Sequence, residues 1–328
     1  MTRSTGLAGG FVMRAPGLDE ARPIAGLINA CLRAERSTAV VSPTWLRTLW
    51  QTPGFDLEGD AWVVTAGEGR PVGYAHLWDY PPHVALFLRL HVHPDFNGLG
   101  IDAVLLRAAE ERARRAVPRA PAGARVVLAT RVNGHNQATW DLFRWAGYAQ
   151  VRRLWDMGLS LELPPPEPRW PAGFGVRTCV PGQDEWAVYQ ALMEAQQDYW
   201  SMVSPPFAHW VHWETRVGMF DPSLWFLAVR EETIVGVALC TPAWGKDPRR
   251  GGIDYFGVRP AWRDQGVGEA LLRHALRELH RRGVAGVGTE VDAQDKTGVK
   301  QACEEVGMRV LAWHDLFEKE LRPGGARA

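Results

Sequence analysis

The chain contains few cysteines, no excess of charge of either sign and no long apolar run. Its four cysteines, Cys31, Cys179, Cys240 and Cys303, lie far apart, which argues against a disulfide framework or a paired-cysteine metal site and indicates a reducing, cytoplasmic setting. Lysine plus arginine and aspartate plus glutamate balance at 37 each, so no basic field attracts nucleic acid or an anionic membrane. No apolar stretch is long enough to span a bilayer, and no hydrophobic segment near the start suggests a signal peptide.

The sequence contains an internal repeat. The passage from Val92 to Leu106 recurs as Val258 to Leu272, 166 residues later and without a gap. A length of 328 residues leaves room for two domains of ordinary size. We therefore predict a tandem duplication with an N-terminal domain over 11–162, a proline-rich linker over 163–173 and a C-terminal domain over 174–321.

Each copy shows the same order of hydrophobic periodicities. In the second copy two helical segments come first, the second of them after a Ser-Pro start signal at Ser204. A β-hairpin, a strand that ends at Val258, a long amphipathic helix, another strand, a short helix and a final strand follow. The hairpin is expected over 225–229 and 234–240, and the later strand over 287–291. The first copy repeats this order, with its own hairpin over 61–65 and 72–77.

The most informative segment is the loop between the strand that ends at Val258 and the long helix after it. It has the form Arg-x-x-Gly-x-Gly and runs from Arg263 to Gly268. The first turn of a helix leaves backbone N–H groups without partners in the chain, and the helix dipole favours negative charge there. Because small residues let a bulky anion approach these groups, the loop predicts a pyrophosphate-binding site.

With these loops the chain resembles the GNAT superfamily of N-acetyltransferases. The likeness rests on the Val-x-Pro strand end with its glycine loop, on the Asn-containing helical segment over 133–148 that ends in Gly-Tyr, and on the order of elements. It covers nearly the whole chain, twice, which is similar to the tandem acetyltransferases of the mycothiol-synthase type. The resemblance implies an α+β fold with α/β three-layer packing: two tandem GNAT-like domains, each a mixed, mainly antiparallel twisted sheet flanked by helices.

The resemblance also implies an activity. A GNAT enzyme transfers the acetyl group of acetyl-CoA to an amine, so we expect an N-acetyltransferase that acts on a primary amine of a small molecule or peptide, as a monomer or homodimer. Neither nucleic acid, nor a membrane, nor a metal site is expected. The implied cofactor-binding residues in the second copy are Phe256, Val258, Arg263, Asp264, Gln265, Gly266, Val267, Gly268 and Asp295.

The two loops differ in a way that favours the second copy as the site of chemistry. The first copy has Asn97 in place of Arg263, and Asp102 in place of Gly268. A carboxylate at a pyrophosphate-binding helix N-terminus repels the phosphate and fills its space. It can instead bond the free N–H groups of the first helical turn itself.

Several residues are candidates for the catalytic acid and base. Asp254, before Val258 on the same strand, and Glu290, on the next strand, are candidates for the base that takes the amine proton, with Asp292 beside them. Each could equally be a solvated charge at a strand end. Cys303 stands where the family often has a tyrosine that protonates the leaving thiolate, whereas the first copy has Phe143 there. Cys303 could also be a small buried core residue.

Two other functions are consistent with the sequence. Gly98-Leu99-Gly100 and the residues after it match a dinucleotide-binding fingerprint, but the strand before that loop belongs to a hairpin pattern rather than to a βαβ unit. Because both tyrosine positions are lost, the chain could also be a non-catalytic acyl-CoA-binding sensor or scaffold. The acceptor stays open among aminoglycosides, amino-sugar thiols, polyamines, peptides and amino acids.

Overall fold

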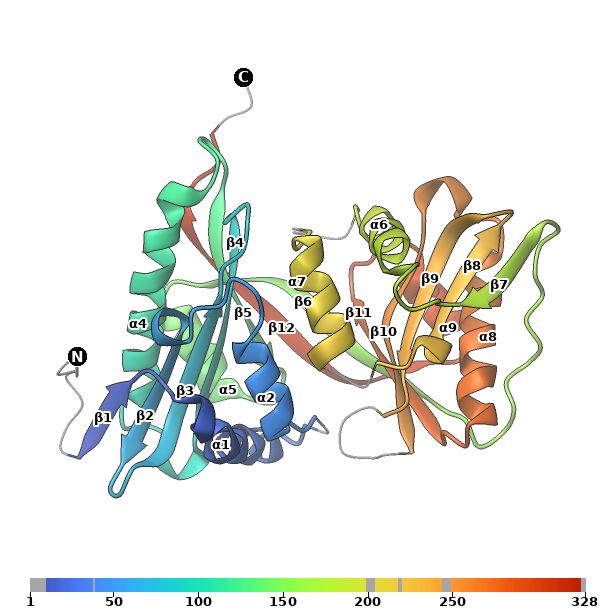
Figure 1. Cartoon of the computed structure of the whole chain (residues 1–328). Helices are drawn as coiled ribbons and strands as arrows, with labels where there is room; N and C mark the ends of the chain where they lie inside the picture. The colour runs from blue at the N-terminus through green and yellow to red at the C-terminus, as the bar shows by residue number, and fades with distance from the viewer. Residues whose placement is uncertain (1–9, 38, 199–203, 218–219, 244–248, 326–328) are drawn as a thin grey trace. The chain divides into compact units, whose positions relative to one another are not determined.

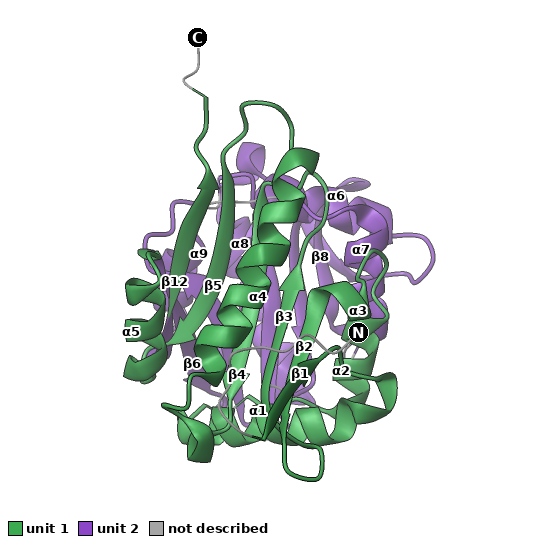
Figure 2. Cartoon of the chain, turned by 90° about the vertical axis from the view of Figure 1, so that its left-hand side faces the viewer, with its two compact units in different colours: residues 1–151, 315–328 green, residues 152–314 purple. Residues whose placement is uncertain are grey.

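The computed structural model describes residues 10–37, 39–198, 204–217, 220–243 and 249–325. They form two compact units: unit 1 comprises residues 1–151 and 315–328, and unit 2 comprises residues 152–314 (Figure 2). The described part of the chain has no helix that is long and apolar enough to cross a membrane. All four cysteines are buried and free of disulfide bonds.

Unit 1 contains a sheet with the strand order β1-β2-β3-β4-β5-β12 (Figure 1). Its strands are β1 (Phe11–Arg14), β2 (Ala61–Ala66), β3 (Arg70–Trp78), β4 (Ala85–Val92), β5 (Val126–Asn133) and β12 (Arg309–Arg322). Its helices are α1 (Ala21–Ala34), α2 (Pro43–Trp50), α3 (Leu57–Asp60), α4 (Ile101–Ala116) and α5 (Gln137–Trp145).

Unit 2 repeats the design with the strand order β6-β11-β10-β9-β8-β7. Its strands are β6 (Ala149–Ser160), β7 (Phe174–Thr178), β8 (Trp225–Arg230), β9 (Thr233–Thr241), β10 (Arg250–Val258) and β11 (Gly286–Asp292). Its helices are α6 (Glu185–Ala195), α7 (Phe207–His212), α8 (Val267–Arg281) and α9 (Val299–Glu305), and a π-helical turn, Trp213–Val217, continues α7.

Each sheet is mixed. The parallel pairs β4–β5 and β10–β11 are flanked by antiparallel pairs such as β3–β4 and β9–β10. This arrangement confirms the predicted fold class. It excludes the dinucleotide-binding alternative, because the strand before each glycine loop pairs antiparallel with its other neighbour, β4 with β3 and β10 with β9, whereas a dinucleotide-binding sheet is mostly parallel there.

Alternating side chains place the two helix layers of unit 2 on opposite faces of its sheet. On β8, Phe226 and Ala228 pack into the same apolar cluster as α8, whereas Leu227 packs with α6. This follows from the two-residue period of a strand. On α8, residues spaced by three and four supply the face that meets the sheet, and Leu271, Leu272 and Leu276 are fully buried there.

The last strand of each sequence repeat is exchanged between the units. Most of β6, which ends the first repeat, pairs antiparallel with β11 of unit 2, from Leu154 opposite Asp292 to Ser160 opposite Gly286. β12, which ends the second repeat, lies beside β5 in unit 1, where Phe317 is fully buried. The predicted boundaries 11–162 and 174–321 thus describe the sequence repeats, whereas the compact units differ from them by this exchange. The hydrophobic period of a segment shows that it is a strand, but it does not show which strand it pairs with.

Candidate active site

The two parallel strands of unit 2 separate before they end. Pairing of β10 with β11 runs from Arg250 opposite Gly286 to Ile253 opposite Thr289 and then stops, although both strands continue. At the last pair the Thr289 hydroxyl donates to the carbonyl oxygen of Ile253 at 2.8 Å. The Thr289 side chain thus occupies the carbonyl oxygen that would accept the next backbone hydrogen bond between the two strands. Because that backbone bond is not needed, the strands can diverge.

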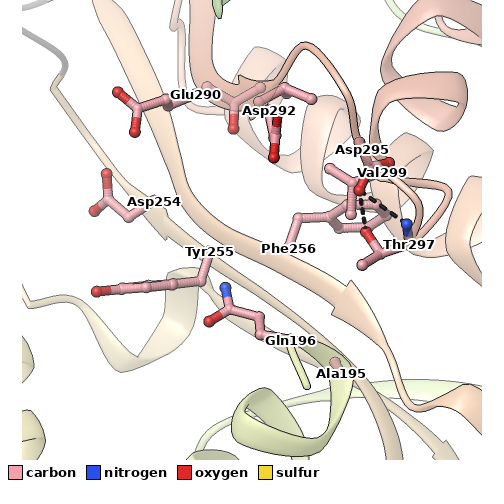
Figure 3. Close-up of a pocket in the computed structure, with 12 residues that line it drawn as sticks. Ala195, Gln196, Asp254, Tyr255, Phe256, Glu290, Asp292, Asp295, Thr297 and Val299 are labelled. Carbon is pink, nitrogen blue, oxygen red and sulfur yellow. Dashed lines mark hydrogen bonds between the residues drawn. The ribbon is translucent and has the colours of Figure 1, made fainter. Parts of the chain in front are cut away.

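A β-bulge marks the same point on β10. Against β9, Ile253 lies opposite Cys240 and Tyr255 opposite Leu239, so Asp254 is the extra, unpaired residue. The corresponding strand of unit 1 keeps an unbroken register, with Gly73 opposite Val92 through to Trp78 opposite Phe87. Because a bulge re-aims side chains, it lets Asp254 and Tyr255 both point to the same side of the strand (Figure 3).

A pocket opens where the strands diverge (Figure 3). One wall comes from β10 and the end of α6, and the other from β11 and the loop that leads to α9. The described residues that line it are Ala195, Gln196, Asp254, Tyr255, Phe256, Thr289, Glu290, Val291, Asp292, Asp295, Thr297 and Val299. The structure thus brings together both predicted bases with the predicted cofactor residues Phe256 and Asp295.

The glycine loop of unit 2 presents free backbone amides at the start of α8. Gly266 caps the helix in the left-handed conformation, at φ 78°, without any side-chain capping bond. The first amide with an acceptor is that of Ala270, which donates to the carbonyl oxygen of Gly266. The amides of residues 264–269 have no acceptor in the described parts of the chain. Such a row of donors at a helix N-terminus suits a pyrophosphate.

The side chains of this loop make hydrogen bonds that fix the position of the loop. The Arg263 guanidinium donates to the carbonyl oxygens of Val258 and Ala195 and to the Asp198 carboxylate. Gln265 donates to the carbonyl oxygen of Ala261. Val267 is buried in the core below. In this structure the predicted cofactor contacts of the segment therefore rest on its backbone, while Arg263 fixes its position against the end of α6.

The equivalent loop of unit 1 carries a carboxylate at the start of its helix. The Asp102 carboxylate accepts a hydrogen bond from the Ala103 amide at 2.8 Å, so it serves its own helix. The pocket beside that loop is also lined by Glu35, whose carboxylate accepts a hydrogen bond from Asn136. Glu35 and Asp102 thus place two carboxylates in the lining of this pocket.

Asp254 has the electrostatic properties of a general base. Its side chain reaches solvent, yet protein surrounds the carboxyl on most sides. This burial raises the pKa of Asp254 to about 6, and a hydrogen bond with Thr241 opposes the shift. At neutral pH the group is ionised and still basic enough to take a proton.

A second carboxyl, not found from the sequence, lies close to Asp254. Burial, and after it the charge of Asp254, raises the pKa of Glu214 to about 8, while a hydrogen bond with Tyr255 opposes the shift. Its Oε1 atom is buried and has no hydrogen-bond partner in the described residues. Glu214 comes from the π-helical turn after α7, a local irregularity that hydrophobic periodicity does not reveal.

The other acids of the pocket have different surroundings. Glu290 lies directly opposite Asp156 on β6, and both lie beside His314, with ligand atoms within 4.8 Å of one another. Asp292 pairs with Arg152 at 3.7 Å. Asp295 accepts hydrogen bonds from the amides of Thr297 and Lys300 and so orders the turn before α9 (Figure 3).

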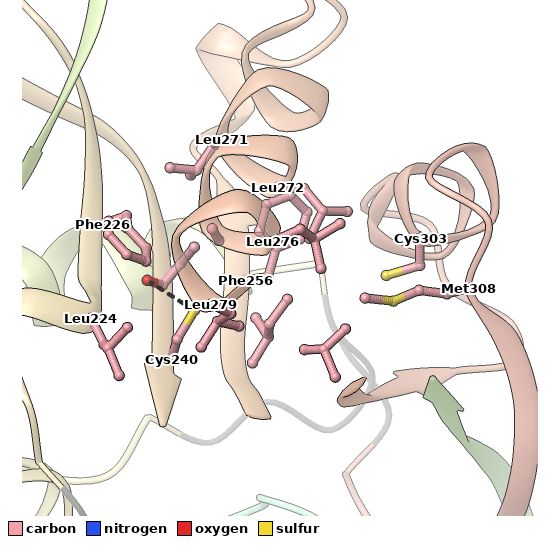
Figure 4. Close-up of a cluster of buried hydrophobic side chains, with 14 of the residues drawn as sticks. Leu224, Phe226, Cys240, Phe256, Leu271, Leu272, Leu276, Leu279, Cys303 and Met308 are labelled. Atoms are coloured by element: carbon pink, nitrogen blue, oxygen red, sulfur yellow. Dashed lines mark hydrogen bonds between the residues drawn. The ribbon is translucent and has the colours of Figure 1, made fainter. Parts of the chain in front are cut away.

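Cys303 lies outside the pocket. It is 1% exposed and packs with Met308 in the main apolar cluster of unit 2 (Figure 4). Burial raises the pKa of its thiol to about 12, which makes it a poor proton donor to a thiolate. The structure therefore favours the core role that the sequence allowed for this residue over the catalytic one.

The family model for acetyltransferases of the GNAT family matches the chain twice, over residues 28–148 and 187–307. The chain belongs to the GNAT family. As a GNAT protein it is an N-acetyltransferase, and acetyl-CoA is its acyl donor. The two matches contain the two glycine loops, so both copies of the repeat derive from this family.

Relatives of similar length match most of the chain. The chain is 33% identical to a mycothiol acetyltransferase of Streptomyces scabiei over 72% of each chain, and 28% identical to one of Thermobispora bispora over 88% of this chain and 92% of the relative. Among solved structures, a GCN5-related N-acetyltransferase from Sphaerobacter thermophilus is similar with a TM-score of 0.77, 34% identity, and coverage of 97% of this chain and 98% of that one.

Proposed function

We propose that unit 2 carries the chemistry, and that this GNAT enzyme transfers the acetyl group of acetyl-CoA to a primary amine of a small molecule. The observation that carries the proposal is the contrast between the two loops. Residues 264–269 of unit 2 offer free amides, whereas Asp102 occupies the matching helix start in unit 1. The names of the curated relatives support a small-molecule acceptor.

In this proposal the loop holds the pyrophosphate, and the pantetheine chain enters where β10 and β11 diverge. The thioester then lies beside Asp254, which projects from the bulge (Figure 3). Asp254 takes a proton from the acceptor, and the neutral amine nitrogen attacks the thioester carbon. The C–N bond forms, the C–S bond breaks, and the CoA thiolate gains a proton. The main contribution of the protein is orientation, with Asp254 supplying base catalysis.

A matched pair of loop variants tests which unit is active. Gly266 and Gly100 cap equivalent helices at φ 78° and 77°, so Gly266→Glu and Gly100→Glu impose the same backbone strain. We expect Gly266→Glu to abolish acetyl-CoA binding and CoA release with an amine panel, and Gly100→Glu to keep both. The opposite result would place the chemistry in unit 1.

A further inference from the structure

The proline-rich linker lies along helix α8 of unit 2. It joins β6 to β7, which stand at opposite ends of the strand order of this unit, and its residues 164–171 form neither helix nor strand. At its start the amide of Leu161 donates to the carbonyl oxygen of Ala285 at 2.8 Å. At its end the amide of Phe174 donates to the carbonyl oxygen of Pro171 at 3.1 Å. Both ends of the linker are thus fixed within unit 2.

Contacts with two residues of α8 hold the linker against one face of that helix. The Arg277 guanidinium donates to the carbonyl oxygen of Pro165 at 2.7 Å and forms an ion pair with Glu167. The Trp170 ring meets the His274 ring edge-on, with 6.4 Å between the centroids, and Trp170 also packs against the main apolar cluster of unit 2. Arg277 and His274 are three residues apart in the chain, so they share a helix face.

The end of the linker reaches the glycine loop. A Cβ atom placed on Gly266 would lie 3.7 Å from Cγ of Pro171, so the proline ring lies against the residue that caps α8. The lengths of the two segments agree with this path. From Arg277 back to Gly266 the helix measures about 17 Å, and an extended proline-rich segment from Pro165 to Pro171 covers about 19 Å. The linker therefore runs antiparallel to α8, from Arg277 to the N-cap.

The conformation of the glycine loop depends on support from its surroundings. Asp264 adopts a left-handed backbone conformation, at φ 60°, which persists for a residue other than glycine where the surrounding structure holds it. Arg263 fixes the loop against the end of α6, and the linker contacts it at Gly266, three residues further along the chain. Holding a loop in its bound conformation before the ligand arrives reduces the entropy lost on binding and so raises affinity.

On the basis of the proposed donor site in unit 2, we propose that the linker is a positioning segment for acetyl-CoA. Trp170 and Pro171 hold the start of α8 and the glycine loop in the conformation that directs the free amides toward the pyrophosphate. The described residues that line the pocket between β10 and β11 include none from the linker, so the linker stays apart from the reacting atoms. Loosening it should therefore weaken donor binding without slowing the chemical step.

Acetyl-CoA should in turn stabilise the linker, because coupling between two sites is reciprocal. Arg169 is exposed and directly precedes Trp170, so trypsin can cleave the chain there when the linker opens away from α8. If donor binding favours the docked linker, saturating acetyl-CoA should slow this cleavage by about fivefold or more. A linker that only joins two domains would be cleaved at the same rate with and without the donor.

Trp170→Ala and Arg277→Gln test the proposal in the full-length protein. We expect each to raise the Kd of acetyl-CoA, measured by calorimetry, by about five- to tenfold, and to keep kcat with an amine panel at saturating donor within about twofold of the parent. Trp170→Phe, which retains an aromatic ring against His274, should restore most of the affinity. Arg281→Gln is the matched control, because Arg281 lies on the same helix with 72% of its side chain exposed and pairs with Glu278. This variant should leave the Kd unchanged.

Parental affinity in both linker variants, or cleavage at Arg169 that acetyl-CoA does not slow, would overturn the inference. A fall in kcat with an unchanged Kd would also overturn it. Arg277→Gln alters a partly exposed side chain, so it decides the outcome by itself if Trp170→Ala does not fold. Gly266→Glu separates the two proposals. If that variant keeps parental affinity, the donor site in unit 2 is wrong and the inference fails with it; if it loses affinity and the linker variants do not, the inference alone fails.

Discussion

The Thr289 hydroxyl donates to the carbonyl oxygen of Ile253 at 2.8 Å, at the last paired position of β10 and β11. Unit 1 contains the same relationship, since Thr130 donates to the carbonyl oxygen of Leu88 at 3.1 Å at the end of the β4–β5 pairing. Both units therefore separate their parallel strands by the same means. Only unit 2 adds a bulge at the next residue, which brings Asp254 into the opening.

Replacement of Thr289 by valine should reduce both stability and activity. The variant leaves a buried carbonyl without a donor, which costs about 1–2 kcal/mol. It also lets the strands shift where the thioester must lie, so we expect kcat to fall by about tenfold or more. Thr130→Val is the matched control: it should cost similar stability, measured by denaturant unfolding, and spare kcat. An equal loss of kcat in both variants would contradict this role.

A carboxylate placed at the helix start of unit 2, as in unit 1, should weaken the binding of acetyl-CoA there. Gly268→Asp places a carboxylate where Asp102 stands in unit 1, and we expect acetyl-CoA affinity to fall by about 10- to 100-fold through charge repulsion and lost amides. Calorimetry on the parent protein should show one bound equivalent. Asp102→Gly should leave that affinity and stoichiometry unchanged. Two equivalents in the parent would show that unit 1 also binds the donor.

Activity should depend on pH through Asp254. The carboxyl acts as a base only when ionised, so kcat/KM should fall as the pH drops below about 6. Asp254→Asn should lower the rate by about 10²–10⁴-fold and remove this acid limb, while acetyl-CoA affinity is kept. A variant that retains the parent rate and profile would shift the role of base to Glu290 or to a bound water.

Cys303→Ala should separate the two roles considered for that residue. If Cys303 is a core residue, shortening its buried side chain should lower the free energy of unfolding by about 1 kcal/mol. The value of kcat should then stay within about threefold of the parent, because the thiol lies outside the pocket. A catalytic proton donor would give the reverse pattern, with unchanged thermal unfolding and a large loss of kcat.

The exchange of last strands predicts which fragment folds. Residues 174–328 correspond to the second repeat but lack β6, so β11 loses the partner that pairs from Gly286 to Asp292. An unpaired sheet edge promotes aggregation. We expect this fragment to aggregate, and residues 152–314, which retain most of β6, to remain monomeric by size-exclusion chromatography and to unfold cooperatively. A stable, active 174–328 fragment would show that β12 can replace β6.

Local patterns were enough to predict most of the architecture. The repeat of Val92 to Leu106 at Val258 to Leu272 indicated two copies, and strand and helix periods placed the elements around the glycine loops correctly. The difference between Asp102 and Gly268 also predicted that the carboxylate would bond the first turn of its own helix, which the structure confirms. These features depend on residues close together in the chain.

Only the tertiary structure decided which strands pair and which acids meet. Either last strand has the hydrophobic pattern that β5 or β11 requires, so the exchange of β6 and β12 could not be read from periodicity. The approach of Glu214 to Asp254 depends on a π-helical turn and a bulge, each a departure from regular geometry by one residue. The burial of Cys303 likewise follows from packing of α9 on the sheet. Periodicity reports the average geometry of an element, whereas burial and pKa depend on long-range contacts made after folding.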